Sequence, residues 1–148
     1  MRVMGTSGTG FNSDIVQGML FAGGLPNSTG TVYTGATPIK VMNLSLGSTG
    51  GGCSNSYQGV FNDLYDRNIT VVSSSGNEAQ EAPGVYGYPA SCENVISVAA
   101  TDATRLRAYY STYNDKVDIA APGGDVGADV NADGYSDGVI AFGGDEDL

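Results

Sequence analysis

The sequence predicts an α/β fold with a mostly parallel β-sheet, and three observations support this prediction. Residues 39–46 are mostly apolar without clean alternation, which is typical of a central strand buried on both faces, and the apolar pair Val71-Val72 predicts a second strand at 70–74. Between them, apolar residues recur at helical spacing from Tyr57 to Tyr65. Because strand, helix and strand are joined by short connections, they form a right-handed βαβ unit with parallel strands.

The elements before this unit are predicted from shorter patterns. Residues 2–5 are an apolar run that predicts a strand, and a glycine-rich loop follows it. Ser13 is a suitable N-cap, and Asp14 lies in a first turn, where the helix dipole favours negative charge. Apolar residues at helical spacing in 15–20 predict a helix that ends at Gly23.

Two further strands are predicted after the βαβ unit, at residues 95–100 and 117–120, the second of them buried. In parallel sheets, ligands bind beyond the carboxyl ends of the strands. Two short segments lie at the carboxyl ends of neighbouring predicted strands and are therefore candidate binding segments. They are Ser45, Leu46 and Gly47 at the end of the first strand, and Ser75, Gly76 and Asn77 at the end of the second.

Asn77 is the most informative residue at these strand ends. Residues 71–78 read VVSSSGNE, a buried strand that stops abruptly at Gly76, which allows a sharp turn or a close approach. The Asn77 side chain then offers two N–H donors, which suit a developing negative charge on a substrate oxygen. The same residues also fit an ordinary strand and turn, because Gly-Asn is common turn chemistry.

Composition narrows the function classes. The 148 residues fit one domain, and 16 acidic residues against 6 basic ones argue against nucleic acid or an anionic membrane as partner. No apolar run reaches membrane-spanning length, and the first residues are those expected of an interior fragment. The chain contains no histidine, so by itself it cannot supply a Ser–His–Asp set.

Seven of the sixteen carboxylates lie from Asp125 onward, which predicts either a disordered acidic tail or a cation site. Oxygen-bearing residues there follow the alternate spacing of a calcium loop, with Gly134 at the sharp turn. The predicted Ca²⁺ ligands are Asp129, Asn131, Asp133, Tyr135 and Asp137. Ile140 replaces the expected bidentate glutamate. We predict a calcium-type loop at 125–140, against the alternative of a solvated turn.

Together these motifs resemble the subtilisin-like serine proteases of extracellular bacterial type. The order and spacing of NLSLG, VVSSSGNE, GYPASCENVISVAA and VDIAAPGG carry the resemblance, which covers nearly the whole chain up to Gly124. RVMGTSGTGFNSDIVQGM is similar to the segment that precedes the first of these motifs in the family. The resemblance implies a three-layer α/β fold, with residues 1–148 as the central portion of a single peptidase domain.

The resemblance also implies roles for individual residues. Asn77 matches the oxyanion-hole asparagine of the family. The two edge segments that pair with a substrate backbone match Gly8, Thr9 and Gly10 on one side and Ser45, Leu46 and Gly47 on the other. Ser74, Ser75 and Gly76 match the lining of the primary specificity pocket. The implied partners are an extended peptide or protein substrate and, in the full-length protein, a pro-peptide inhibitor.

The catalytic aspartate, histidine and serine of the family have no counterpart in this chain. The resemblance therefore implies an internal fragment of a secreted endopeptidase that is inactive alone. The alternative is a non-catalytic, calcium-dependent peptide-binding or interaction module. A nucleotide-binding α/β domain ranks last, because no G-x-G-x-x-G or Walker A sequence is present.

Cys53 and Cys92 permit one disulfide, although the count alone leaves two free thiols equally open. Extracellular members of the family often carry a disulfide in comparable loops. The resemblance therefore implies a Cys53–Cys92 bridge and a secreted protein. In the chain-entropy account, closing a loop of about 40 residues stabilises by about 4 kcal/mol.

Overall fold

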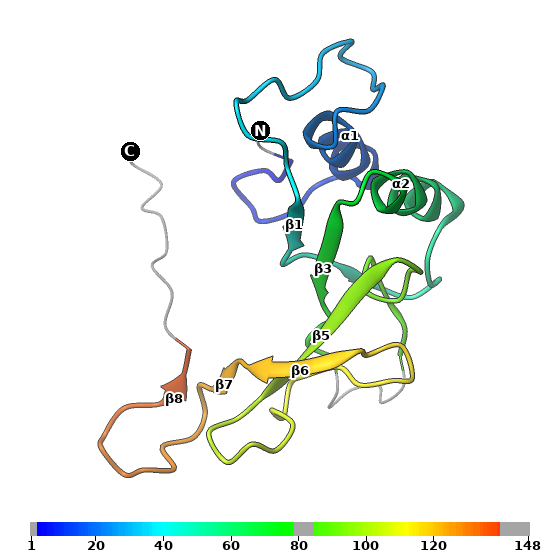
Figure 1. The fold of residues 1–148 in the computed structure, drawn as a ribbon. Coiled ribbons are helices and arrows are strands. Elements are labelled where there is room, and N and C mark those ends of the chain that lie inside the picture. Colours follow the sequence, from blue (N-terminus) through cyan, green and yellow to red (C-terminus); the bar gives the residue numbers. More distant parts are fainter. Residues whose placement is uncertain (1–2, 79–84, 140–148) are drawn as a thin grey trace.

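The computed structural model of this protein describes residues 3–78 and 85–139, and Figure 1 shows their arrangement. Within these ranges the chain forms two helices and eight short strands. In chain order they are α1 (Asn12–Ala22), β1 (Val41–Leu44), β2 (Ser48–Thr49), α2 (Asn55–Asp66), β3 (Thr70–Ser74), β4 (Gly87–Tyr88), β5 (Val95–Thr101), β6 (Ile119–Pro122), β7 (Gly124–Asp125) and β8 (Asp137–Gly138).

The main sheet has the order β1-β3-β5-β6, and every neighbouring pair is parallel. This confirms the predicted parallel sheet. Two small antiparallel ladders, β2–β4 and β7–β8, join segments for which the sequence predicts loops. Because β1 and β3 are direct neighbours, the segments that follow them leave the sheet at the same edge.

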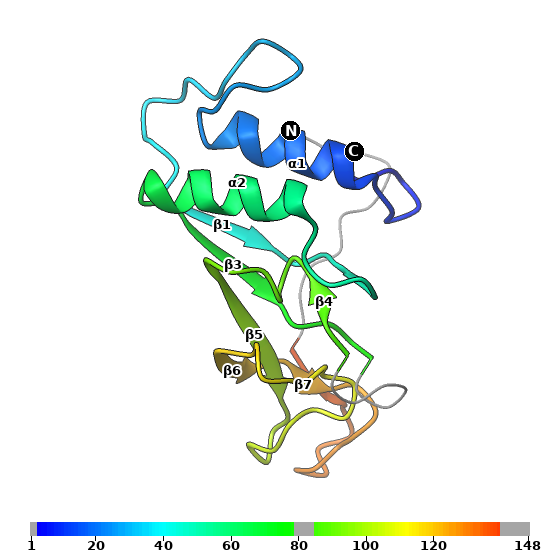
Figure 2. The same ribbon diagram turned by 90° about the vertical axis from the view of Figure 1, so that its right-hand side faces the viewer.

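Both helices lie on one face of the sheet, with α2 between α1 and the strands (Figure 2). Strand residues alternate between buried and more exposed positions, as in Val41–Leu44 and Thr70–Ser74, so the prediction that the first strand is buried on both faces was wrong. The buried face packs against Phe61 and Leu64 of α2, which are fully buried. The described residues therefore supply the sheet and the helical layer on one of its faces. No described helix is long and apolar enough to cross a membrane.

Helix α2 forms where its apolar spacing predicts it. The Ser54 hydroxyl accepts a hydrogen bond from the Tyr57 N–H at 3.3 Å and so caps the first turn. The buried side of the helix consists of Tyr57, Val60, Phe61 and Leu64. Tyr65, which also matched the apolar spacing, is 62% exposed. The pattern thus predicted the helix correctly but extended its apolar stripe one residue too far.

Three local expectations were wrong. Helix α1 begins at Asn12 with Phe11 as N-cap, so Ser13 lies inside the first turn and does not cap it. Residues 3–5 are irregular and form no strand. The last strand of the main sheet is Ile119–Pro122, later than predicted, and Ile119 is 54% exposed. β6 ends the sheet on the side away from α2, so it stays exposed among the described residues, and its apolar sequence does not reveal this.

Cys53 and Cys92 form a disulfide with their Cα atoms 5.1 Å apart, which confirms the predicted pairing. The bridge ties the segment before α2 to the segment before β5. Cys92 belongs to the buried core, and Cys53 packs against it. The cross-link therefore joins two residues that are 39 positions apart in the sequence, with β3 and the turn after it between them.

Replacing both cysteines by alanine is expected to lower the free energy of unfolding by about 4 kcal/mol, because the unfolded chain loses its loop constraint. Urea unfolding of the protein and of its Cys53→Ala/Cys92→Ala variant measures this difference. Reduced and oxidised samples of the unmodified protein serve as the matched control. Equal midpoints for all samples would show that the bridge contributes nothing to stability.

Candidate functional site

The carboxyl ends of β1 and β3 meet around a small hollow of about 130 Å³. Leu44 and Ser73 are paired across the two strands, so the segments that follow begin side by side. All seven predicted residues of these segments line the hollow: Ser45, Leu46, Gly47, Ser74, Ser75, Gly76 and Asn77. The rest of the lining was not predicted from the sequence and consists of Ser48, Thr49, Glu78, Gly87, Tyr88 and Ala90.

A larger groove of about 590 Å³ adjoins this hollow. Gly8, Thr9 and Gly10 line it together with Ser45, Leu46 and Gly47, so the two predicted edge segments share one groove. Ile15 of α1 and Tyr57 of α2 also contribute to its lining. The residues common to both hollows are Ser45, Leu46, Gly47, Ser48 and Tyr88. One segment after β1 therefore borders both spaces.

The segment after β1 is held by the β2–β4 ladder, in which Ser48 pairs with Tyr88. Gly47 lies directly against this ladder. A Cβ atom at Gly47 would stand 2.9 Å from the Tyr88 carbonyl oxygen, closer than real Cβ atoms approach. The position therefore requires glycine, and the close approach fixes the segment between the two hollows.

The turn after β3 presents Asn77 to solvent while its backbone is fixed. The Ser75 N–H donates to the Val98 carbonyl oxygen at 2.9 Å, which extends the contact between β3 and β5 by one residue. Gly76 has a φ of +112°, a conformation that favours glycine. The Asn77 N–H donates to Glu78 Oε2 at 2.8 Å. Within the described ranges no hydrogen bond engages the Asn77 side-chain amide, so its donors remain available.

Polar groups also link the groove lining across the fold. Asn12 Nδ2 donates to the Tyr88 hydroxyl at 3.3 Å, and hydrogen bonds from Asn12 and Ser48 lower the pKa of Tyr88. Burial, and then the nearby Tyr88, raise the pKa of Tyr57. Asn12 and Tyr88 are 76 residues apart in the chain, so no local sequence pattern could have found this contact.

The predicted calcium loop folds onto its own backbone. Asp129 Oδ1 and Asn131 Oδ1 both accept from the Asp133 N–H, at 3.1 and 2.9 Å. Asp133 Oδ1 accepts from the Tyr135 N–H at 2.9 Å, while the Asp137 carboxylate accepts from the Val130 N–H. The β7–β8 ladder closes the base of the loop.

The donor set of this loop consists of oxygens, which suits a hard cation such as Ca²⁺. In the part of the chain that the structure describes, however, no three acidic or cysteine side chains gather closely enough to hold a metal ion. Ile140, at the position of the missing glutamate, lies outside the described residues. The chemistry of the loop thus fits calcium, while its carboxylates are not gathered around one point.

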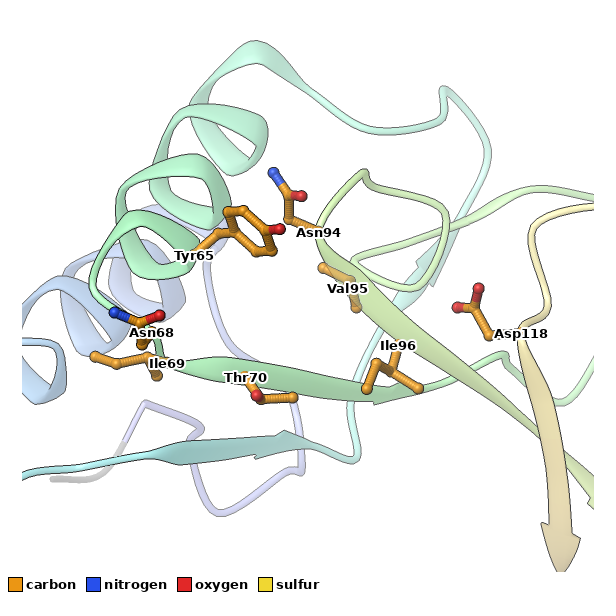
Figure 3. Close-up of a pocket in the computed structure, with 8 residues that line it drawn as sticks. All are labelled: Tyr65, Asn68, Ile69, Thr70, Asn94, Val95, Ile96 and Asp118. Carbon is orange, nitrogen blue, oxygen red and sulfur yellow. The ribbon is translucent and has the colours of Figure 1, made fainter.

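A third hollow, of about 560 Å³, lies at the opposite end of the sheet. Figure 3 shows its lining side chains, which come from the end of α2, the beginnings of β3 and β5, and the turn before β6. Asp118 accepts there from the Ser97 N–H at 2.8 Å. None of the predicted site residues lines this hollow, which sits at the amino ends of the strands rather than at their carboxyl ends.

The fold and these hollows are those of an α/β protein with open grooves at the carboxyl ends of neighbouring parallel strands. The model of the subtilase family, a family of peptidases, matches residues 1–141. The chain belongs to the subtilase family. The resemblance of the sequence motifs to this family is thereby confirmed.

Relatives and a solved structure agree with this assignment. The chain is 35% identical over 142 residues to an extracellular protease of Xanthomonas campestris, covering 96% of this chain and 23% of the relative. It is 39% identical over 123 residues to an extracellular basic protease of Dichelobacter nodosus, covering 83% and 19%. A solved protease structure from Pseudoalteromonas arctica matches with a TM-score of 0.73 and 35% identity, covering 84% of this chain and 35% of that one.

The chain thus spans between about a fifth and a third of the length of these three proteins. It is part of a subtilisin-like protein. The parallel sheet and its flanking helices are the fold features that the solved relative shares.

Proposed function

We propose that this chain is the substrate-binding and oxyanion-stabilising portion of a secreted serine endopeptidase of the subtilase family. It represents the central part of a single peptidase domain within a longer protein, called the full-length protein below. The observation that carries the proposal is the Asn77 amide, which no hydrogen bond engages within the described ranges, at the strand end beside the shared groove. The family membership and the names of the extracellular relatives support the reaction class and secretion.

The groove suits an extended peptide. Gly8, Thr9 and Gly10 on one side and Ser45, Leu46 and Gly47 on the other are exposed or partly exposed segments without regular structure. Such segments can pair with a peptide main chain on both sides, which gives affinity independent of side chains. The smaller hollow beside Ser74 and Gly76 then receives one substrate side chain. Pairing of this kind also suits a pro-peptide bound as an inhibitor.

The chemical role of Asn77 follows from acyl transfer. When a nucleophile attacks the scissile carbonyl carbon, the carbonyl oxygen gains negative charge, and donors fixed in advance stabilise it. Asn77 Nδ2 supplies such donors from a turn whose backbone is already held. The base must come from outside these 148 residues, because the chain has no histidine to activate a serine. No serine of the chain matches the catalytic serine of the family, so we expect the nucleophile from outside as well.

The experiment that tests this proposal compares the full-length protein with the purified 148-residue chain on a chromogenic peptide. We expect hydrolysis by the full-length protein and none by the chain alone. Hydrolysis by the highly pure chain would contradict the proposed division of roles. Calcium-dependent peptide binding without hydrolysis by the full-length protein would favour the non-catalytic interaction module instead.

We also propose that the loop of Asp129, Asn131, Asp133, Tyr135 and Asp137 binds Ca²⁺. Both the oxygen-only donor set and the mutual repulsion of its carboxylates support this proposal. A bound cation would neutralise that repulsion and stiffen the loop. The Asp129 and Asp133 side chains would turn from the backbone amides toward the ion.

Calorimetry of the full-length protein with calcium is expected to show a binding event that Asp129→Asn/Asp133→Asn removes. Calcium should also raise the melting temperature of the unmodified protein, because ligand binding stabilises the folded state. Asp63→Asn, on the exposed side of α2, is the matched control and should retain the heat. A signal that survives the double substitution would place the binding event elsewhere.

Two further observations bear on secretion and on the partners of the protein. The Cys53–Cys92 disulfide suits an oxidising compartment, where such bridges persist. The acidic balance of the chain disfavours nucleic acid and anionic membranes as partners.

A further inference from the structure

Thr112, in the connection between β5 and β6, is 1% exposed and bonds to the turn that carries Asn77. Its N–H donates to the Gly76 carbonyl oxygen at 3.0 Å, and its carbonyl oxygen accepts from the Ser75 hydroxyl at 2.9 Å. Its hydroxyl accepts from the Glu78 N–H at 3.0 Å and donates to Glu78 Oε2 at 2.9 Å. One buried residue therefore makes four hydrogen bonds to the turn.

The Glu78 carboxylate links Thr112 to the backbone of Asn77. The Oε2 atom that accepts from the Thr112 hydroxyl also accepts from the Asn77 N–H at 2.8 Å. The N–H groups of Asn77 and Glu78, which flank the Asn77 side chain, are thus both fixed by one small network. Hydrogen bonds to a carboxylate are stronger than those between neutral groups, and a buried hydroxyl that is lost is not readily replaced by water.

Gly76 shows how closely this network fits the turn. A Cβ atom at Gly76 would lie 2.5 Å from Glu78 Oε2 and 2.9 Å from Thr112 Oγ1. Both oxygens therefore stand directly against the backbone at the position before Asn77. Asn77 itself is exposed and lines the hollow, while its backbone N–H is held by the Glu78 carboxylate.

We propose that Thr112 is a positioning residue for the oxyanion-stabilising amide. Through the Glu78 carboxylate it holds the Asn77 backbone, and thereby it aims Asn77 Nδ2 at the reacting carbonyl oxygen. Thr112 does not line the hollow, so it acts without touching the substrate. The inference rests on the proposed role of Asn77. Thr112 lies 35 positions after Asn77 in the chain and belongs to no site motif.

The test uses the full-length protein and a peptide substrate. Thr112→Val keeps the shape of the side chain but removes both hydroxyl bonds. It is expected to lower kcat by about tenfold to a hundredfold, since displacements of about 1 Å in an active site have effects of this size. KM should change by less than about threefold, because ground-state binding is untouched. Thr112→Ser restores the hydroxyl and should recover most of kcat.

A double-mutant cycle with Asn77→Ala separates positioning from general stability. Because Thr112 acts through Asn77, Thr112→Val should lower kcat by less than about twofold in the Asn77→Ala background. Thr70→Val, at the exposed far end of β3, is the matched control and should leave kcat unchanged. An equal loss in both backgrounds, or an unchanged kcat for Thr112→Val, would overturn the inference.

The cycle also tells this inference apart from the proposal on which it rests. If Asn77→Ala itself leaves kcat unchanged, the oxyanion role of Asn77 is wrong, and the positioning role of Thr112 falls with it. If Thr112→Val does not fold, Thr112→Ala replaces it in the same cycle under the same criteria. That variant removes the same two hydroxyl bonds and places no methyl group against Glu78.

Discussion

Asn77→Ala in the full-length protein is expected to lower kcat for peptide hydrolysis by about 100- to 1,000-fold, the loss known for the oxyanion asparagine of subtilisin and carried over from it. KM should stay nearly constant, because the donors meet charge that develops only in the transition state. Steady-state kinetics on one chromogenic peptide measures both quantities.

Two further variants sharpen this prediction. Asn77→Asp has nearly the same size but places a carboxylate against the developing oxyanion, so it should be at least as damaging as Asn77→Ala. Asn55→Ala, at the exposed start of α2, is the matched control and should leave kcat unchanged. A wild-type kcat for Asn77→Ala would refute the assigned role.

Gly47→Ala is expected to lower kcat/KM by about tenfold or more, chiefly through KM, because it disturbs uniform substrate binding. The added Cβ atom would lie 2.9 Å from the Tyr88 carbonyl oxygen, a backbone atom that cannot swing away. Either the segment after β1 or the β2–β4 ladder must then shift. Both border the groove, so the spacing of its two edges changes.

Gly59→Ala is the matched control for this prediction. Gly59 lies within α2, and a Cβ atom there would meet nothing within 4 Å. Alanine is a better helix former than glycine, so this variant should gain about 0.5–1 kcal/mol of stability and keep its activity. If Gly47→Ala also retains full kcat/KM, the close approach at Tyr88 does not shape the groove.

The central βαβ unit could be predicted because each of its elements is specified by residues that are close together in the sequence. The helical spacing from Tyr57 to Leu64 and the apolar strands on either side are each sufficient signals. The rule that ligands meet parallel strands at their carboxyl ends predicts the segments after β1 and β3 as binding segments, and the structure places these segments side by side. The segment 8–10 was predicted only through the family resemblance.

The missing features depend on contacts between distant parts of the chain. Glu78 and Thr112 are bonded across 34 residues, and neither belongs to a recognisable pattern. The exposure of β6 depends on its position at the end of the sheet, and the sequence of the strand does not determine that position. The N-cap of α1 was misplaced because Ser13 is a good capping residue that the chain uses inside the first turn instead.

The most direct measurement is a structure of the full-length protein bound to a peptide boronic acid, which mimics the tetrahedral intermediate. We expect a boron-bound oxygen about 2.7–3.1 Å from Asn77 Nδ2, the distance typical of an oxyanion donor. We also expect the peptide to lie between the segments 8–10 and 45–47. A boronate oxygen that faces away from Asn77, or a peptide bound in the hollow at the amino ends of β3 and β5 (Figure 3), would contradict these expectations.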